Sequence, residues 1–125
     1  MTALFVEPAP DDLVVLDVRR ADGSVRLVAT GEIDSSSAPQ FRQTLEALLD
    51  EPEVSEIVVD MGGVTFLDSA GLCVLAAAHR RIKGRGIHLR VLASSRAVIR
   101  PLQITGLWDL LQVEQSNVAT LPVRA

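Results

Sequence analysis

The sequence predicts an α/β fold, a small mixed sheet of about four to five strands with helices wound as successive right-handed β-α units. Three observations predict it. Two β-rich runs meet at a short turn, amphipathic helical stretches then alternate with apolar β-branched runs, and 48% of the 125 residues are hydrophobic while only 3% are aromatic. Alternation of this kind favours parallel strands joined by right-handed crossovers, and the length suits one domain.

The first two predicted strands form a β-hairpin. Leu13 to Val18 is rich in β-formers, and Asp22-Gly23 is a typical hairpin turn. In residues 24–30 every second side chain is apolar, namely Val25, Leu27 and Ala29. Since alternate residues of a strand face opposite sides, these three are expected to face the core.

The first helix is predicted after a polar break at Ser35-Ser36-Ser37. Ser37-Ala38-Pro39-Gln40 has the pattern of a capping box, with proline in the first turn where its missing N–H does no harm. Apolar residues then recur at helical spacing, at Phe41, Leu45, Leu48 and Leu49. Asp50-Glu51-Pro52-Glu53 is expected to end the helix.

A second strand–helix unit follows. Ile57-Val58-Val59 is an unbroken β-branched run, as expected for a strand buried on both faces. Gly62-Gly63 is then expected to loosen the chain before the turn at Asp68-Ser69. The helix that begins there has a predicted apolar face made of Leu72, Leu75, Ala76, His79 and Ile82.

The last unit begins with a strand in which Ile87, Leu89 and Val91 alternate with His88 and Arg90. Ser94-Ser95 can cap a final helix that ends at Gly106 and carries Val98, Ile99 and Leu102. Pro101 falls inside this helix, so a kink or an early proline-tolerant turn is expected there. Residues 107–113 are predicted to hold one more short element.

Two features of the second helix have alternative interpretations. Arg80, Arg81 and Lys83 near its end match the negative end of the helix dipole, but could also form a docking patch for a partner. Cys73 is the only cysteine, which excludes an internal disulfide and suits a reducing cytosol. It is either a small packing residue or a regulatory thiol.

Composition excludes several functions. The net charge of −4 argues against direct binding of nucleic acid. No apolar run approaches the roughly 18 residues of a membrane span, and no signal peptide is visible, so a cytoplasmic protein is expected. His79, His88 and Cys73 lack partners at metal-ligand spacing, and no glycine-rich phosphate loop is present. Neither a metal nor a cofactor is therefore predicted.

Ser69 is the candidate functional residue. A nucleophile elbow needs G-x-S-x-G, but Leu67 stands two residues before this serine, so hydrolase chemistry is disfavoured and the protein is not expected to be an enzyme. Asp68-Ser69 could simply cap the next helix. However, Ala70 and Gly71 remove bulk around the hydroxyl, and a second acid, Asp34, ends the second strand. Parallel strands bring both turns to one edge of the sheet.

Four segments carry a family resemblance: Gly31-Glu32-Ile33-Asp34, Val58-Val59-Asp60-Met61, Phe66-Leu67-Asp68-Ser69-Ala70-Gly71-Leu72 and Leu102-Gln103-Ile104-Thr105-Gly106-Leu107. Together they resemble the anti-sigma factor antagonists, small bacterial proteins of the STAS domain family. The resemblance runs over residues 13–113, which we take as the STAS domain. Residues 1–12 are expected to be a flexible N-terminal lead-in, and residues 114–125 a C-terminal tail.

The resemblance implies a stress-response, partner-switching role in transcription regulation. In the family, the unphosphorylated protein binds an anti-sigma factor that is also a serine kinase, and so frees the sigma factor. Phosphorylation of the serine at the position of Ser69 stops this binding, and a serine phosphatase reverses it. The implied partner-binding residues are Asp34, Asp68, Ser69, Ala70 and Gly71.

One departure from the family pattern stands out, because a second hydroxyl residue often follows the switch serine and here the position is Ala70. Ser69 is therefore the only hydroxyl of that turn. The alternative function is a STAS module of a scaffold or lipid-transport complex, without sigma-factor control.

Overall fold

The computed structural model describes residues 13–116. Its elements are β1 (Val14–Ala21), β2 (Ser24–Ile33), α1 (Ala38–Leu49), β3 (Glu56–Leu67), α2 (Ser69–Ile82), β4 (His88–Ala93), α3 (Arg96–Thr105), α4 (Leu107–Leu110) and β5 (Glu114–Gln115). The order agrees with the prediction. The sheet also continues two residues past the expected end of the domain, because Glu114 and Gln115 pair with the end of β4.

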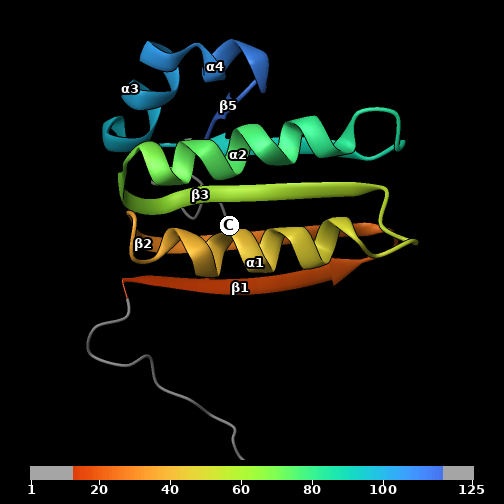
Figure 1. Ribbon diagram of the computed structural model, residues 1–125. Helices are drawn as coiled ribbons and strands as arrows, with labels where there is room; N and C mark the ends of the chain where they lie inside the picture. The colour runs from red at the N-terminus through yellow and green to blue at the C-terminus, as the bar shows by residue number, and fades with distance from the viewer. Residues whose placement is uncertain (1–12, 117–125) are drawn as a thin grey trace, which may run out of the picture.

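The five strands lie side by side in the order β1-β2-β3-β4-β5. β1 is antiparallel to β2, and every later pair is parallel, so the sheet is mixed as predicted. Figure 1 shows α1 and α2 side by side across one face of the sheet, with α3 and α4 grouped toward β5. The carboxyl ends of β2 and β3 consequently meet at one edge, where α1 and α2 begin.

The core lies between this helix layer and the sheet. Val25, Leu27 and Ala29 are buried in it as the hairpin alternation predicts. The predicted stripe of α1 is buried as well, from Phe41 to Leu49. A core of aliphatic side chains lets helices and strands pack closely, and this closeness fixes where each element begins and ends.

Val58 is buried in a different way from its two neighbours. Ile57 and Val59 belong to the core, whereas Val58 is only 3% exposed but lies outside the core cluster. Its register partners on the flanking strands are Arg26 and Arg90. These arginines form ion pairs with acidic residues of the same sheet, so their stems shield the valine. The β-branched run is thus buried on both faces as predicted.

Two local expectations need correction, and a third concerns Pro101. The chain does not loosen at Gly62-Gly63, because β3 continues through both glycines. Its pairing with β2 instead contains register shifts in this part of the strand. The buried face of α2 includes Val74 and Ala78, which the predicted stripe left out, since α2 packs against α1 as well as the sheet. Helix α3 contains Pro101 in its interior and ends as predicted at Gly106, whose left-handed backbone has a φ of 82°.

Residues 1–12 and 117–125 lie outside the described residues, so the predicted lead-in and most of the predicted tail remain predictions. Between residues 13 and 116, the structure contains no helix with the length and apolar character needed to cross a membrane.

Candidate functional site

The candidate site lies where β2 and β3 end side by side. Ile33 and Leu67 are register partners at the last position of the two parallel strands. The backbone amide of Asp68 then donates a hydrogen bond of 3.2 Å to the carbonyl oxygen of Ile33. The turn that carries Asp34 and the turn that carries Ser69 are therefore fastened together, as the parallel topology predicts.

Ser69 is the first residue of α2, and its side chain is exposed. The helix is capped by the residue before it: Asp68 has extended backbone angles, and its Oδ1 accepts a hydrogen bond of 2.9 Å from the amide of Ala70. Among residues 13–116, no hydrogen bond involves the Ser69 hydroxyl. Because Asp68 fills the capping role, the hydroxyl is free for another partner.

Asp34 is half-buried and organises its own turn. Its Oδ1 accepts hydrogen bonds from the hydroxyl of Ser36 (2.7 Å), the amide of Ser36 (2.9 Å) and the amide of Ser37 (3.2 Å). The hydroxyl of Ser36, followed by its amide, holds the pKa of Asp34 below its ordinary value, since these bonds stabilise the ionised carboxylate. Every one of these bonds uses Oδ1, so Oδ2 is available to a docking protein.

Ser37 has a role that the sequence did not reveal. Its side chain is buried. The hydroxyl donates a hydrogen bond of 2.8 Å to the carbonyl oxygen of Glu32 and accepts one of 3.0 Å from the amide of Asp34. It makes no capping hydrogen bond to α1, so the predicted capping box is wrong. The hydroxyl stabilises the turn before the helix instead, while Pro39 does lie in the first turn as expected.

Ala70 and Gly71 differ in their surroundings. Ala70 is partly exposed beside the hydroxyl, but Gly71 is buried. A Cβ on Gly71 would come within 2.4 Å of Leu67 Cδ1 and 2.7 Å of Ile33 Cγ2. The view of Gly71 as a residue that bares the hydroxyl therefore needs correction. Its lack of a side chain lets α2 approach the strand ends, which positions Ser69.

Phe66 is a surface residue that sequence reasoning missed. It is 46% exposed and lies three residues before Ser69, at the end of β3. Val64 and Leu67 are both buried, so the two residues between them face outward. The only signal for this in the sequence is the place of the aromatic residue directly before the turn. Exposed aromatic residues are enriched in protein interfaces.

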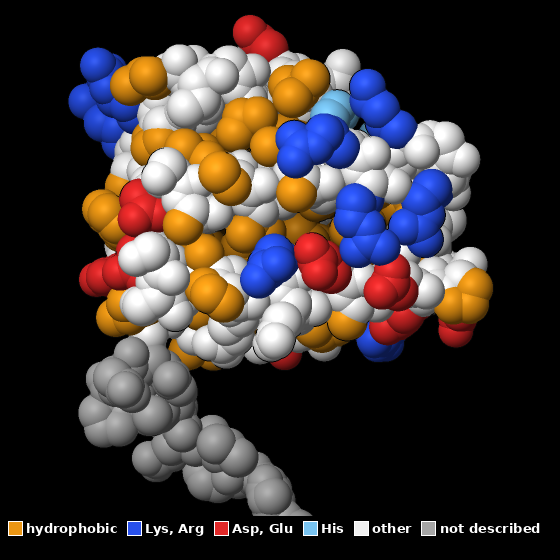
Figure 2. Space-filling model, in the orientation of Figure 1, with side chains coloured by type: hydrophobic (Ala, Val, Ile, Leu, Met, Phe, Trp, Pro, Cys, Tyr) orange, Lys and Arg blue, Asp and Glu red, His pale blue; other side chains and the backbone are white. Residues whose placement is uncertain are grey.

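The described residues contain no group of three or more histidine, cysteine or acidic side chains that could hold a metal ion. Figure 2 shows acidic side chains at the left edge of the molecule, where β2 and β3 end, and basic side chains interspersed with acidic ones farther along α1 and α2. The chemistry available at the turns is thus a hydroxyl, two carboxylates and an aromatic ring. This set suits recognition by another protein.

Comparisons with known proteins agree with this description. A family model described as "Mlab, STAS domain" matches residues 16–112. The chain is 30% identical over 102 residues to the anti-sigma-B factor antagonist of Bacillus subtilis, covering 82% of this chain and 92% of that protein.

Solved structures give the same result. The crystal structure of an anti-sigma factor antagonist from Mycobacterium paratuberculosis has a TM-score of 0.79 and 30% identity, covering 94% of this chain and 97% of that chain. The structure of the Bacillus cell fate determinant SpoIIAA in its phosphorylated form has a TM-score of 0.66 at 17% identity, covering 88% of this chain and 98% of that chain. The second match shows a common fold.

Proposed function

The chain belongs to the STAS domain family of anti-sigma factor antagonists, and on this basis we propose that it binds an anti-sigma factor and thereby frees a sigma factor. The unphosphorylated form is the binding form, and phosphorylation of Ser69 by the same partner ends the binding. Asp34, Asp68, Ser69, Ala70 and Gly71 form the partner-binding turns, with Gly71 acting through packing. In this role the protein is a regulatory binding module and performs no catalysis.

The observation that carries the proposal is the exposed Ser69 hydroxyl at the start of α2. A protein kinase needs an acceptor hydroxyl that is exposed on the surface of its substrate and can enter the kinase active site. Phosphoserine carries about −1.5 to −2 charges near neutral pH, and the free amides and dipole of a helix N-terminus stabilise an anion there. The fold can therefore accept the phosphoryl group without rearrangement.

The interface would not accept it equally well. A partner surface that fits a neutral hydroxyl between Asp34 and Asp68 would meet extra bulk and a dianion that must lose its water on docking. The neighbouring carboxylates add repulsion, since two unit charges about 6 Å apart repel by roughly 3 kcal/mol at an effective dielectric constant near 20. A binding loss of about 3 kcal/mol weakens an interaction by more than a hundredfold.

A relative with the same fold supports this switch. SpoIIAA of Bacillus has been solved in a phosphorylated form, and that form keeps the fold of the present chain. By the same analogy, the partner is an anti-sigma factor with serine kinase activity and a serine phosphatase restores the hydroxyl. We place the protein in the cytoplasm, where sigma factors act.

The test is a phosphorylation reaction with the candidate anti-sigma factor and ATP, read by intact mass and by mapping of the modified residue. We expect one phosphate, located on Ser69. The variant Ser69→Ala should gain none, whereas Ser55→Ala, which removes an exposed hydroxyl at the opposite end of β3, should be phosphorylated like the wild type. A protein that binds no anti-sigma factor and takes up no phosphate would instead favour the scaffold or transport-complex role.

A further inference from the structure

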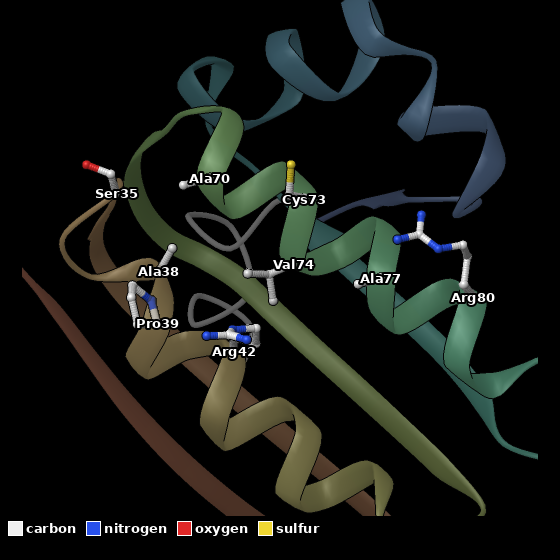
Figure 3. Close-up of a pocket in the computed structure, with 9 residues that line it drawn as sticks. All are labelled: Ser35, Ala38, Pro39, Arg42, Ala70, Cys73, Val74, Ala77 and Arg80. Carbon is white, nitrogen blue, oxygen red and sulfur yellow. The ribbon is translucent and has the colours of Figure 1, made fainter.

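A groove of about 380 Å³ lies between α1 and α2 and starts beside the Ser69 turn. Figure 3 shows Ser35 and Ala70 at one end of it and Arg80 at the other. Ala70 directly follows Ser69 in the chain. A protein that covers the Ser69 hydroxyl would therefore also lie over the mouth of this groove.

Small and apolar side chains form most of the groove lining. They are Ala38, Pro39, Ala70, Cys73, Val74 and Ala77. On α2 the lining residues recur every three or four positions, so they form one face of the helix. Because alanine is too short to fill the space between two helices, the facing surfaces leave room for side chains that another molecule supplies.

Two arginines flank this apolar lining, Arg42 on α1 and Arg80 on α2. Both are exposed, and in the part of the chain that the structure describes neither forms an ion pair or a side-chain hydrogen bond. Arg81, the next residue along α2, is in contrast paired with Asp50 at 2.6 Å. Two unpaired cations beside an apolar groove favour an occupant that is apolar on one side and acidic on the other.

We propose that the groove between α1 and α2 receives an amphipathic segment of the anti-sigma factor, whose apolar side chains pack on the alanines and whose carboxylates pair with Arg42 and Arg80. This inference rests on the proposed function and extends it. The Ser69 turn serves as the switch, and the groove holds the partner in register so that the hydroxyl is presented to the kinase active site.

A second copy of the chain fits the groove poorly. In a symmetric dimer the same surface lies on both subunits, so the arginines of one copy would face those of the other. Repulsion between like charges at an interface opposes such pairing. The charge of the groove therefore distinguishes an acidic partner from self-association.

Cys73 allows a direct test because it lines the groove, is exposed and is the only cysteine of the chain. Its rate of alkylation by N-ethylmaleimide is measured by intact mass for the free protein and for the complex with the anti-sigma factor. We expect alkylation at least about tenfold slower in the complex, since access to an interface core is blocked by the packed partner.

Three results would overturn the inference. If the anti-sigma factor binds and Ser69→Asp prevents binding, but Cys73 is alkylated equally fast in the complex, the groove is not occupied and the proposed function still stands. If raising the concentration of the protein alone protects Cys73, the occupant is a second copy. If no anti-sigma factor binds at all, the proposed function and the inference both fail.

Matched variants give a second test by calorimetric measurement of the dissociation constant. Ala77→Trp fills the groove and should weaken binding by about tenfold or more, whereas Ala47→Trp, on an exposed part of α1 outside the groove, should not. Arg42→Glu and Arg80→Glu should each weaken binding by about tenfold, unlike Arg19→Glu on β1. Unchanged binding in Ala77→Trp, Arg42→Glu and Arg80→Glu, with unchanged melting temperatures, would contradict the inference.

Discussion

The amide of Asp68 donates a 3.2 Å hydrogen bond to the carbonyl oxygen of Ile33, and this bond joins the ends of two parallel strands. Asp34 is the next residue after Ile33, and Ser69 is the next after Asp68. Together with the pairing of β2 and β3, this backbone contact holds the turn of the candidate carboxylate next to the turn of the candidate hydroxyl. Such a rigid arrangement suits a switch that acts through added charge without a change of fold.

Ser69→Ala and Ser69→Asp should separate binding from phosphorylation. Ser69→Ala should bind the anti-sigma factor and stay bound when ATP is present, because it offers no acceptor. Ser69→Asp should bind at least about tenfold more weakly, since it places a charge where the partner fits a neutral group. Calorimetry with each variant checks this.

Ser55→Asp is the matched control for that experiment. It adds the same charge at an exposed serine just before β3, at the opposite end of the strand from Ser69, and should bind like the wild type. If Ser69→Asp and the wild type bind with equal affinity, the switch assignment is lost.

Asp34→Asn should distinguish a partner contact from a structural role. Asparagine keeps the Oδ1 acceptor that Ser36 and Ser37 use, so the turn should persist with only a small loss of stability, because a neutral amide oxygen accepts these bonds less strongly than a carboxylate. Loss of the charge should weaken partner binding by about tenfold if Oδ2 pairs with the anti-sigma factor. Asp34→Ala removes the Oδ1 acceptor as well as the charge, so it should also reduce stability. A normal affinity in Asp34→Asn would leave Asp34 with its structural role alone.

Asp34 should also contribute to the loss of stability in acid. Its pKa is lowered in the folded protein by the hydroxyl and amide of Ser36, whereas the unfolded chain has the ordinary aspartate value of about 3.9. The unfolded state therefore binds the proton more readily. The stabilisation is complete above that value and disappears as the pH falls through the lower folded pKa.

Carbon-detected NMR of the Asp34 carboxyl should give a midpoint below the ordinary value. Glu51 and Glu114 also have lowered pKa values, because each accepts a hydrogen bond from an arginine, so the acid dependence of the wild type combines several groups. The free energy of unfolding of Asp34→Asn should be less dependent on pH between about 5 and 2 than that of the wild type. If the free energy of unfolding depends equally on pH in both proteins, Asp34 does not contribute to the loss of stability in acid.

Local patterns predicted the elements because most helices and strands bury one side, while the run in β3 is buried on both. The stripe from Phe41 to Leu49 and the alternation from Val25 to Ala29 could be read directly from spacing. The exposed position of Ser69 was predicted correctly from its place in a turn beside the small Ala70, although Gly71 is buried and plays a different part. Asp34 and Ser69 were placed at one edge because parallel strands end together, although no single segment contains both.

What the sequence could not predict depends on contacts between distant segments. Val74 and Ala78 are buried because α2 packs on α1, and a single-helix pattern does not contain that neighbour. The two-residue strand β5 exists only through pairing with β4 and is too short to have a pattern. Ser37 had the sequence of a helix cap, but its hydroxyl found the carbonyl of Glu32.

Ser37→Ala should destabilise the protein by about 1–3 kcal/mol, because the carbonyl of Glu32 and the amide of Asp34 would both lose a buried partner. Chemical denaturation measures the change. Ser35→Ala, at an exposed position of the same turn, should alter stability by less than about 0.5 kcal/mol. Equal effects of the two substitutions would show that the Ser37 hydroxyl bonds do not stabilise the turn.

Gly71→Ala tests whether close packing of α2 on the strand ends positions Ser69. Alanine is favoured over glycine in a helix by about 1 kcal/mol, which alone would stabilise the protein. The added Cβ would however lie 2.4 Å from Leu67 Cδ1 and 2.7 Å from Ile33 Cγ2. Overpacking of this kind costs about 1–3 kcal/mol, so the net effect should be a loss of about 1 kcal/mol.

A double-mutant cycle with Leu67→Val makes this prediction specific. Valine lacks the Cδ1 methyl, so Gly71→Ala should cost less in that background than in the wild type. Relief should be partial because Ile33 Cγ2 remains in place. The displaced helix start should also slow phosphorylation of Ser69 by the anti-sigma factor. If Gly71→Ala stabilises the protein and leaves that rate unchanged, glycine at this position is not needed to seat the helix.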